Sequence, residues 1–378
     1  MMNEYLHAAQ GLQHFLCENF WDGKALIGPD SGVRFERRVW RFVKSYLAFL
    51  TWADNYYYLQ AQGYWVLANW QLYDLLGEQQ MADTAIKCAL SILEAQQPDG
   101  HWAYPHSGWA GRITTVEVVW AALGMLASYE RISEATLLAG VIKAYNFLVK
   151  RTGFQEARAG YAINYFANRP GGLVPNNTTL ALAFFGRLAQ VTADERYLTH
   201  CPALMAFLAS AQLETGEFPY AISSAVGKGR VHFQCYQYNA FELQDLAMYW
   251  EATQDTTVLP VITRIAQFLS VSVKENGSTR FDCTDSSVEV VYNTAAIAAA
   301  LGIARRMRLH NSLEAENRAY GHVLSQQHGN GGFAFSSRDY GFLTDRRYYP
   351  RPLAMILYHL LWKASEADAS QYQERKLP

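Results

Sequence analysis

Hydrophobic residues recur at three- and four-residue steps through much of the chain, which is the spacing of a helix with one buried face. Residues 137–148 and 204–211 follow this pattern. Other segments are rich in small residues and apolar on nearly every side, as in residues 294–301. The pattern predicts two sets of helices, one half exposed and one buried.

The helices belong to a repeat. Six times, an amphipathic segment runs into a turn that contains glycine and is followed by an aromatic residue in most copies, as in Gln96 to Trp102 and Gln326 to Phe333. The turn glycines stand at positions 23, 100, 153, 216, 277 and 331. Such regular self-similarity is typical of an architecture built from stacked units. We therefore expect six units of two helices each.

Buried and half-exposed helices alternate along the chain. Twelve such helices can all have the burial that their sequences predict if the buried set forms an inner ring and the half-exposed set surrounds it. The predicted fold is an all-α (α/α)6 toroid, since an open stack would expose its ends. Links from an inner to the next outer helix are short, whereas the reverse links are longer and rich in Trp, Tyr, His and Arg. Longer loops on a rigid scaffold usually hold the functional groups, so we expect a site in an axial cup on that face.

Composition limits the function classes. The 378 residues include 32 Lys+Arg and 34 Asp+Glu, a balance that argues against a nucleic-acid-binding protein. No linker-like segment divides the chain, so residues 1–366 are expected to form one domain, followed by a polar tail at 367–378. The N-terminus lacks a signal-peptide pattern, and the longest apolar run is too short to span a membrane. Five scattered cysteines without a CxxC pair favour the cytoplasm and predict neither a metal site nor a cofactor.

Two carboxylates occupy equivalent positions in the repeat. Glu117 lies in the sequence Val-Glu-Val-Val-Trp of unit two, and Glu289 lies in Val-Glu-Val-Val-Tyr of unit five. Units three steps apart in a ring of six face each other, so the two side chains are expected on opposite sides of the axis as an acid/base pair. Thr114 and Ser286 stand three positions earlier, so both glutamates also match helix capping boxes, a structural role that can coexist with catalysis.

The segment 232–243 starts the fourth inner helix with polar and aromatic side chains that an ordinary core helix does not need. Unpaired polar groups are costly to bury, so some of them are expected to face a wet cavity. We assign Tyr236 and Tyr238 as proton-relay or stacking groups. The candidate binding residues of this segment are His232, Asn239 and Glu242.

The last long loop concentrates arginines before the final inner helix. Arg346, Arg347 and Arg351 are predicted to hold a carboxylate or phosphate, since guanidinium groups recognise both with two parallel hydrogen bonds. Pairing of these arginines with acidic residues, which would help to close the ring, is the alternative.

Aromatic residues gather at the predicted loop ends. Their rings could stack on sugars, stabilise carbocations or pack the loops onto the barrel. The remaining candidate binding residues are Tyr57, Gln62, Trp102, Tyr104, His106, Trp120, Asn176, Asn177, Tyr292, Tyr340 and Tyr348.

These repeats resemble known families. The Gln96 to Trp102 and Gln326 to Phe333 segments look like the repeats of squalene-hopene cyclases and protein prenyltransferase β subunits. Residues 61–63 and 72–78 look like six-hairpin carbohydrate enzymes, and residues 236–243 are similar to a motif in the C-terminal domain of glucuronyl epimerases. All of these resemblances imply an α/α toroid that covers the whole chain.

Motifs that these families need but this sequence lacks help to choose among the possible functions. The DxDD run of class II terpene cyclases, the DDxxD run of class I cyclases and the zinc-binding Asp-x-Cys of prenyltransferases are all absent. Asn239 stands where the epimerase resemblance favours His. The leading hypothesis is therefore acid/base chemistry on a uronic-acid or polysaccharide-precursor sugar, of the epimerase, lyase or hydrolase type. The alternatives are a terpenoid or meroterpenoid cyclase, with Asp282 or Asp285 as its acid, and a glycan-binding toroid without catalysis.

Overall fold

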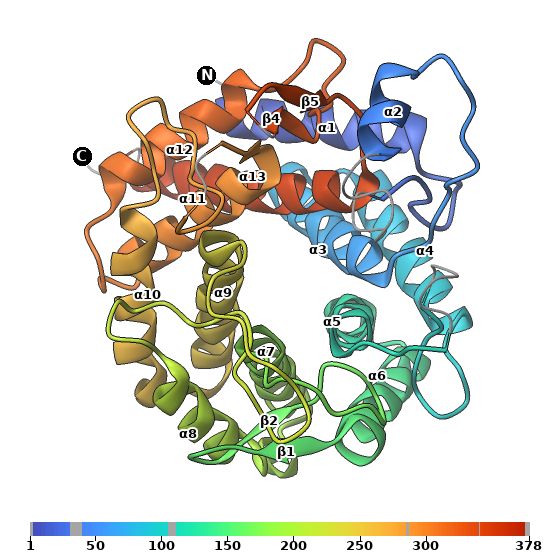
Figure 1. Cartoon of the computed structure of the whole chain (residues 1–378). Helices are drawn as coiled ribbons and strands as arrows, with labels where there is room; N and C mark the ends of the chain where they lie inside the picture. The colour runs from blue at the N-terminus through green and yellow to red at the C-terminus, as the bar shows by residue number, and fades with distance from the viewer. Residues whose placement is uncertain (1–2, 31–39, 105–110, 285–286, 340, 375–378) are drawn as a thin grey trace.

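Two concentric rings of helices form the molecule, as Figure 1 shows in a view down their common axis. The computed structural model describes residues 3–30, 40–104, 111–284, 287–339 and 341–374, with side chains described as far as residue 366. The inner helices are α3 (Leu59–Leu76), α5 (Thr115–Ile132), α7 (Pro175–Thr192), α9 (Cys235–Thr253), α11 (Val291–Arg306) and α13 (Pro350–Glu374). The outer helices are α1 (Glu4–Asn19), α4 (Gln79–Glu94), α6 (Ala135–Phe147), α8 (Cys201–Ala211), α10 (Leu259–Ser270) and α12 (Leu313–Ser325).

The inner ring is closed. Each inner helix packs against the next along the chain, and the last inner helix, α13, packs against the first, α3. Helix α13 also packs against α1. The predicted (α/α)6 toroid is therefore confirmed. Helix α13 runs to Glu374 and so continues into the segment that was predicted as a tail.

The inner helices are buried on nearly all sides and the outer helices on one face, as the hydrophobic pattern predicts. Helix α11 is buried at every residue from Asn293 to Ala304, because it contacts both neighbours in the inner ring as well as the outer helices. Helix α10 buries one face only, with Val261, Ile262, Ile265, Phe268 and Leu269 turned toward the ring. None of the helices described is long and apolar enough to cross a bilayer.

Three glutamines of the repeat each connect their unit to the next. The side-chain amide of Gln96 donates to the carbonyl of Gly100 in its own turn (3.1 Å) and to that of Gly140 in the following outer helix (2.9 Å). Gln212 makes the same two bonds to Gly216 and Val261, and Gln327 makes them to Gly331 and Ala8. The last pair joins unit six to α1, so the repeated bond also closes the ring.

The turn glycines allow close contact with the backbone of the next outer helix. A Cβ placed on Gly100 would lie 2.3 Å from the carbonyl oxygen of Lys143, and one on Gly331 would lie 2.3 Å from that of Gly11. Both glycines also have positive φ, which disfavours other residues. The repeat therefore needs glycine for two independent reasons.

Connections differ at the two ends of the toroid, as predicted. Inner helices pass to outer helices through tight links, where Gly77 and Ser133 adopt left-handed conformations as caps of α3 and α5. The reverse connections are long. They contain the short helix α2 (Arg41–Tyr46) and the antiparallel pair β1 (Phe154–Glu156) and β2 (Tyr161–Ile163). A three-stranded sheet, ordered β3 (Glu289–Val290), β4 (Ser336–Asp339) and β5 (Leu343–Asp345), joins the loops of units five and six.

Candidate active site

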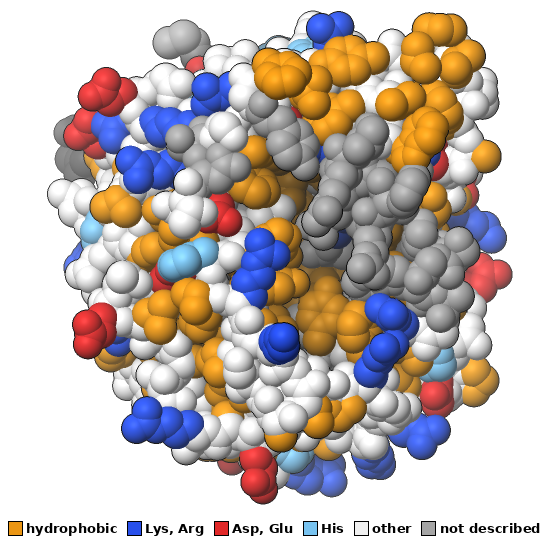
Figure 2. All heavy atoms as spheres, in the orientation of Figure 1, with side chains coloured by type: hydrophobic (Ala, Val, Ile, Leu, Met, Phe, Trp, Pro, Cys, Tyr) orange, Lys and Arg blue, Asp and Glu red, His pale blue; other side chains and the backbone are white. Residues whose placement is uncertain are grey.

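A cavity of about 470 Å3 opens at the end of the toroid where the long loops lie. Figure 2 shows the hollow near the middle of this face, with hydrophobic side chains in its depth and Lys or Arg side chains around it. We call it the axial cavity. Every inner helix contributes a side chain from its first turn, namely Gln60, Glu117, Asn176, Gln237, Tyr292 and Arg351. Six helix N-termini thus converge here, which favours negative charge.

Glu117 lies in the wall of the axial cavity on the first turn of α5 and is only 6% exposed. Its Oε2 accepts hydrogen bonds from the backbone N–H groups of Leu59 (2.6 Å) and Gln60 (3.2 Å) at the start of α3. Thr114 caps α5 by accepting from the Glu117 N–H, as the capping box predicts. The carboxylate itself caps the neighbouring helix instead of its own, so that half of the prediction is wrong.

The pKa of Glu117 is shifted toward neutrality. Burial raises it from its ordinary value to about 7, although the charge of Arg351 and the two backbone hydrogen bonds act in the opposite direction. The carboxyl group therefore exists in both protonation states near neutral pH. A proton-transferring group needs this property.

Glu289 does not reach the axial cavity. It belongs to strand β3, and its neighbours Val288 and Val290 line the cavity, so the alternation of side chains along a strand turns Glu289 away. Its carboxylate accepts from Lys274 (3.2 Å), Ser278 (3.1 Å) and Arg338 (2.9 Å). Burial raises its pKa, but these partners outweigh burial and lower it. The expected pair across the axis is not formed.

Glu289 does not take its predicted place in a second capping box, and Ser286 lies outside the described residues. Helix α11 begins at Val291, two residues after Glu289, with Val290 as its N-cap. Glu289 therefore precedes the helix and cannot occupy its first turn.

Of the three predicted arginines, Arg351 reaches the cavity. Its guanidinium forms two hydrogen bonds of 2.7 Å to the carboxylate of Asp30, and a third of 3.0 Å to Gln60. Arg347 pairs with Asp54 at 2.7 Å, and Arg346 lies beside it in a separate surface hollow. These two arginines fit the alternative of ring closure better than a role in the axial cavity.

Some of the predicted aromatic residues line the axial cavity and others do not. Tyr104, Tyr238 and Tyr292 line the axial cavity. Tyr236 is buried and stacks on Phe268, with ring centroids 4.8 Å apart. It faces the core of the protein and does not line the cavity.

Other predicted aromatics pack the loops and helices. Trp102 is buried and donates from Nε1 to the carbonyl of Ile92 (2.8 Å). Trp120 stacks on Tyr64 with ring centroids 3.9 Å apart, and Tyr57 is partly buried and packs against the core. Tyr348 bonds through its hydroxyl to His328 at 2.7 Å, on the outside of the cavity. The predicted residues His106, Asp285 and Tyr340 lie outside the described residues, and Asp282 accepts within its own turn from Thr284.

Two predicted binding amides have a structural role. Gln62 exchanges hydrogen bonds with both the N–H and the carbonyl of Leu26, and Asn239 does the same with Phe218. Each side chain thereby attaches the long loop of its unit to the inner helix. Asn176 lines the cavity, whereas Asn177 and Glu242 are buried and are not part of its lining.

Several residues of the cavity wall were missed by the sequence analysis. Arg41 and Asp339 line the cavity and form an ion pair with each other, and Asp339 is the carboxylate other than Glu117 among the described lining residues. Arg230 and Gln237 also line it. Position along the repeat could not identify Arg41 or Asp339, because they lie in two long connections, at the start of α2 and at the end of β4.

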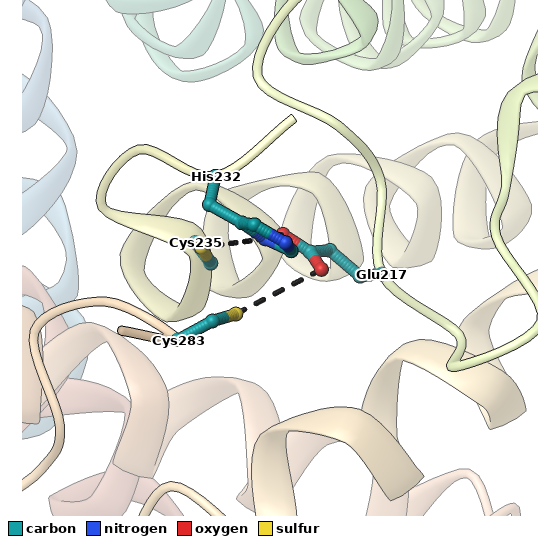
Figure 3. A group of neighbouring side chains, drawn as sticks. All are labelled: Glu217, His232, Cys235 and Cys283. Atoms are coloured by element: carbon teal, nitrogen blue, oxygen red, sulfur yellow. Dashed lines mark hydrogen bonds and ion pairs between the residues drawn. The ribbon is translucent and has the colours of Figure 1, made fainter. Parts of the chain in front are cut away.

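A second group of functional side chains lies beside the cavity, drawn in Figure 3. Glu217, His232, Cys235 and Cys283 bring four possible metal-ligand atoms within 4.8 Å of one another. His232 Nδ1 lies 3.1 Å from a Glu217 oxygen and 3.8 Å from the Cys235 sulfur, and Cys283 lies 3.8 Å from the other Glu217 oxygen. Sequence spacing gave no sign of this group, because its members come from two separate connections, Glu217, His232 and Cys235 from that leading into α9 and Cys283 from that leading into α11.

Comparison with known proteins supports the fold. No family model matches the chain, and no curated protein sequence matches it. Among solved structures it is similar to a cellobiose 2-epimerase from Bacillus thermoamylovorans, with a TM-score of 0.73, 13% identity and coverage of 96% of this chain and 100% of that chain. It is also similar to a GH76 α-mannanase from Bacteroides thetaiotaomicron, with a TM-score of 0.70, 13% identity and coverage of 98% of each chain.

A polysaccharide lyase gives a TM-score of 0.67 at 10% identity, over 97% of this chain and 98% of that chain. These likenesses extend over nearly the whole length of each chain. They agree with the (α/α)6 toroid fold of this protein.

Proposed function

We propose that this protein is a carbohydrate-active enzyme that transfers protons at a sugar bound in the axial cavity, with Glu117 as the acid/base group. The observation that supports this most is the near-neutral pKa of a buried carboxyl group in the wall of an open, aromatic-lined cavity. The names of the similar structures, an epimerase, a mannanase and a lyase, agree with a sugar substrate.

An acidic sugar suits the charges of the cavity. The six helix N-termini place partial positive charge around it, and three arginines line its wall: Arg41, which is paired with Asp339, Arg351, which is paired with Asp30, and Arg230. Arg230 is exposed, donates from Nε to the carbonyl of His232 (3.1 Å), and places its guanidinium carbon 4.1 Å from the ring centre of Phe233. We propose that Arg230 and Arg351 recognise the carboxylate of a uronic acid, or of a polysaccharide precursor that contains one. Tyr104, Tyr238 and Tyr292 offer ring faces for the sugar.

Glu117 can act either as a base that accepts a proton or as an acid that donates one. The ionised form, favoured by the N–H groups of Leu59 and Gln60, would accept a proton from a sugar carbon or hydroxyl. The neutral form would donate one to a leaving oxygen. We propose Asp339 and Tyr238 as the partner groups, since both line the same cavity. Glu289 and Tyr236 are left out, because their side chains are not part of its lining.

Proton NMR in D2O tests the proposal without deciding the reaction beforehand. Cellobiose, a mannobiose and saturated and unsaturated uronic-acid disaccharides are each incubated with the protein. Hydrolysis, elimination and exchange of a sugar C–H for deuterium give different spectra. We expect the wild type to convert at least one acidic sugar and Glu117→Gln to be slower by at least about 100-fold, the range for loss of a general acid/base.

Glu289→Gln is the matched control, because it removes an equivalent carboxylate outside the cavity. It should keep turnover near that of the wild type. Equal turnover by Glu117→Gln and the wild type would contradict the role of Glu117. Binding of a glycan without any product would favour the glycan-binding alternative, and no observation favours the terpenoid cyclase.

All five cysteines are free thiols. This supports a reducing compartment such as the cytoplasm, which we include in the proposal.

A further inference from the structure

We propose that Glu217, His232, Cys235 and Cys283 form a structural zinc site that fixes one wall of the axial cavity. This inference does not depend on the proposed sugar chemistry, because metal content is measured separately from turnover.

The donor atoms suit zinc in kind and number. Two cysteine sulfurs, one imidazole and one carboxylate are all ordinary zinc ligands, and thiolates favour zinc over magnesium or calcium. Four protein ligands are typical of a structural site, since a catalytic zinc keeps one position for water or substrate. Glu217 is 1% exposed and would be an expensive carboxylate to bury without a cation.

The distances also fit. In a tetrahedral zinc site with ordinary bond lengths, neighbouring ligand atoms lie roughly 3.3–3.8 Å apart. The separations here are 3.1 Å from His232 Nδ1 to Glu217 Oε1, 3.8 Å from His232 Nδ1 to Cys235 Sγ, and 3.8 Å from Cys283 Sγ to Glu217 Oε2, and the four ligand atoms all lie within 4.8 Å of one another. Figure 3 shows the four side chains pointing toward a common centre. A zinc ion would need only small movements of these groups.

Surrounding residues hold the ligands in place. Asn239 bonds both backbone groups of Phe218, next to Glu217, and also donates to the carbonyl of Cys235 (3.0 Å). Supporting hydrogen bonds of this kind are usual behind metal ligands. The side chain of His232 is 44% exposed, which gives a metal ion a path from solvent.

The site would join three segments of the cavity wall. Phe233 and Gln234, between His232 and Cys235, line the axial cavity, and so do Tyr220 and Phe281, close to Glu217 and Cys283 in sequence. A disulfide between the two cysteines is the competing arrangement. It would use neither Glu217 nor His232, although both point at the sulfurs.

Metal analysis of the full-length protein tests the site. The protein is purified under reducing conditions, stripped with a chelator, incubated with Zn²⁺ and freed of excess metal. We expect about one zinc per chain in the wild type and in Cys17→Ser, whose half-buried thiol lies elsewhere. Cys235→Ser and Cys283→Ser should each lose tight binding in competition with a zinc-binding dye.

Two measurements on the wild type remain decisive even where a variant fails to fold. Co²⁺ in place of Zn²⁺ should give the absorption bands of a tetrahedral site with thiolate ligands. Removal of zinc should speed hydrogen exchange in residues 217–238 and leave residues 95–104 unchanged. A reduced protein that binds no zinc, or a Cys235–Cys283 disulfide with no zinc binding after reduction, would overturn the proposal.

Discussion

Glu117 and Glu289 have nearly identical neighbours in the sequence but different surroundings in the structure. Glu117 lines the axial cavity, whereas the side chain of Glu289 is turned away from it. The shared Val-Glu-Val-Val motif predicts equivalent roles, but α5 begins at Thr115, two residues before its glutamate, while α11 begins two residues after Glu289. One glutamate lies on a helix and the other on a strand, so the same pattern directs the side chains differently. The strand forms because β4, from another unit, pairs with it. Local sequence does not contain that pairing.

At the scale of the residue, the raised pKa of Glu117 predicts a pH-dependent stability. The folded protein holds a proton on Glu117 up to about pH 7, whereas the unfolded chain releases it near its ordinary value of 4.5. The unfolded state therefore binds fewer protons between these values, so the free energy of unfolding falls as the pH rises through this window. The total loss amounts to roughly 3 kcal/mol.

Urea unfolding of the wild type and Glu117→Gln at several pH values measures this effect. The glutamine keeps an oxygen that can accept from α3 but cannot ionise. Its stability relative to the wild type should increase from pH 4.5 to pH 7 and then level off. A difference that does not change with pH would show that Glu117 titrates normally.

At the scale of the element, the repeat could be predicted because its residues act within short distances. Gln96, Gln212 and Gln327 each bond a glycine four positions later and the adjacent outer helix, so the sequence spacing directly reflects the contact. The roles of Gln62 and Asn239 could not be predicted in this way. Their partners, Leu26 and Phe218, are loop residues that lie 36 and 21 positions earlier in the chain. In the sequence, a single polar residue near the start of a helix is equally consistent with ligand binding, so these structural roles could not be recognised.

Gly23 and Gly100 allow the two roles of the turn glycines to be separated. Their φ angles are +100° and +101°, but a Cβ would meet the Lys143 carbonyl only at Gly100. Gly23→Ala should destabilise the protein by roughly 1–2 kcal/mol through its backbone conformation. Gly100→Ala should cost about 1–3 kcal/mol more, because the helix must move. Chemical denaturation measures both, and equal losses would mean that the close contact is unimportant.

At the scale of the whole molecule, closure of the ring follows from the number of units and is confirmed by contacts between its first and last helices. The composition of the cavity was less predictable. Several of its lining residues, among them Arg41, Arg230 and Asp339, come from the long connections between the outer and inner helices. The Glu217, His232, Cys235 and Cys283 group was missed for the same reason, since residues far apart in the chain meet only after the toroid has formed.

A closed ring predicts that the N-terminal helix is as stable as the others. Helix α1 packs against α13, and its Ala8 accepts a hydrogen bond from Gln327. Hydrogen exchange followed by mass spectrometry should therefore find α1 protected to about the same degree as α6 and α10, because none of the three is a free end. Rapid exchange confined to α1 would indicate an open stack whose first unit frays.

The central claim is that Glu117 changes its protonation state near neutral pH inside the axial cavity. Carbon NMR of protein labelled at the glutamate carboxyl groups measures this directly, with the Glu117 signal assigned by its absence in Glu117→Gln. The account predicts a titration midpoint near 7. A midpoint near the ordinary value of 4.5 would contradict it.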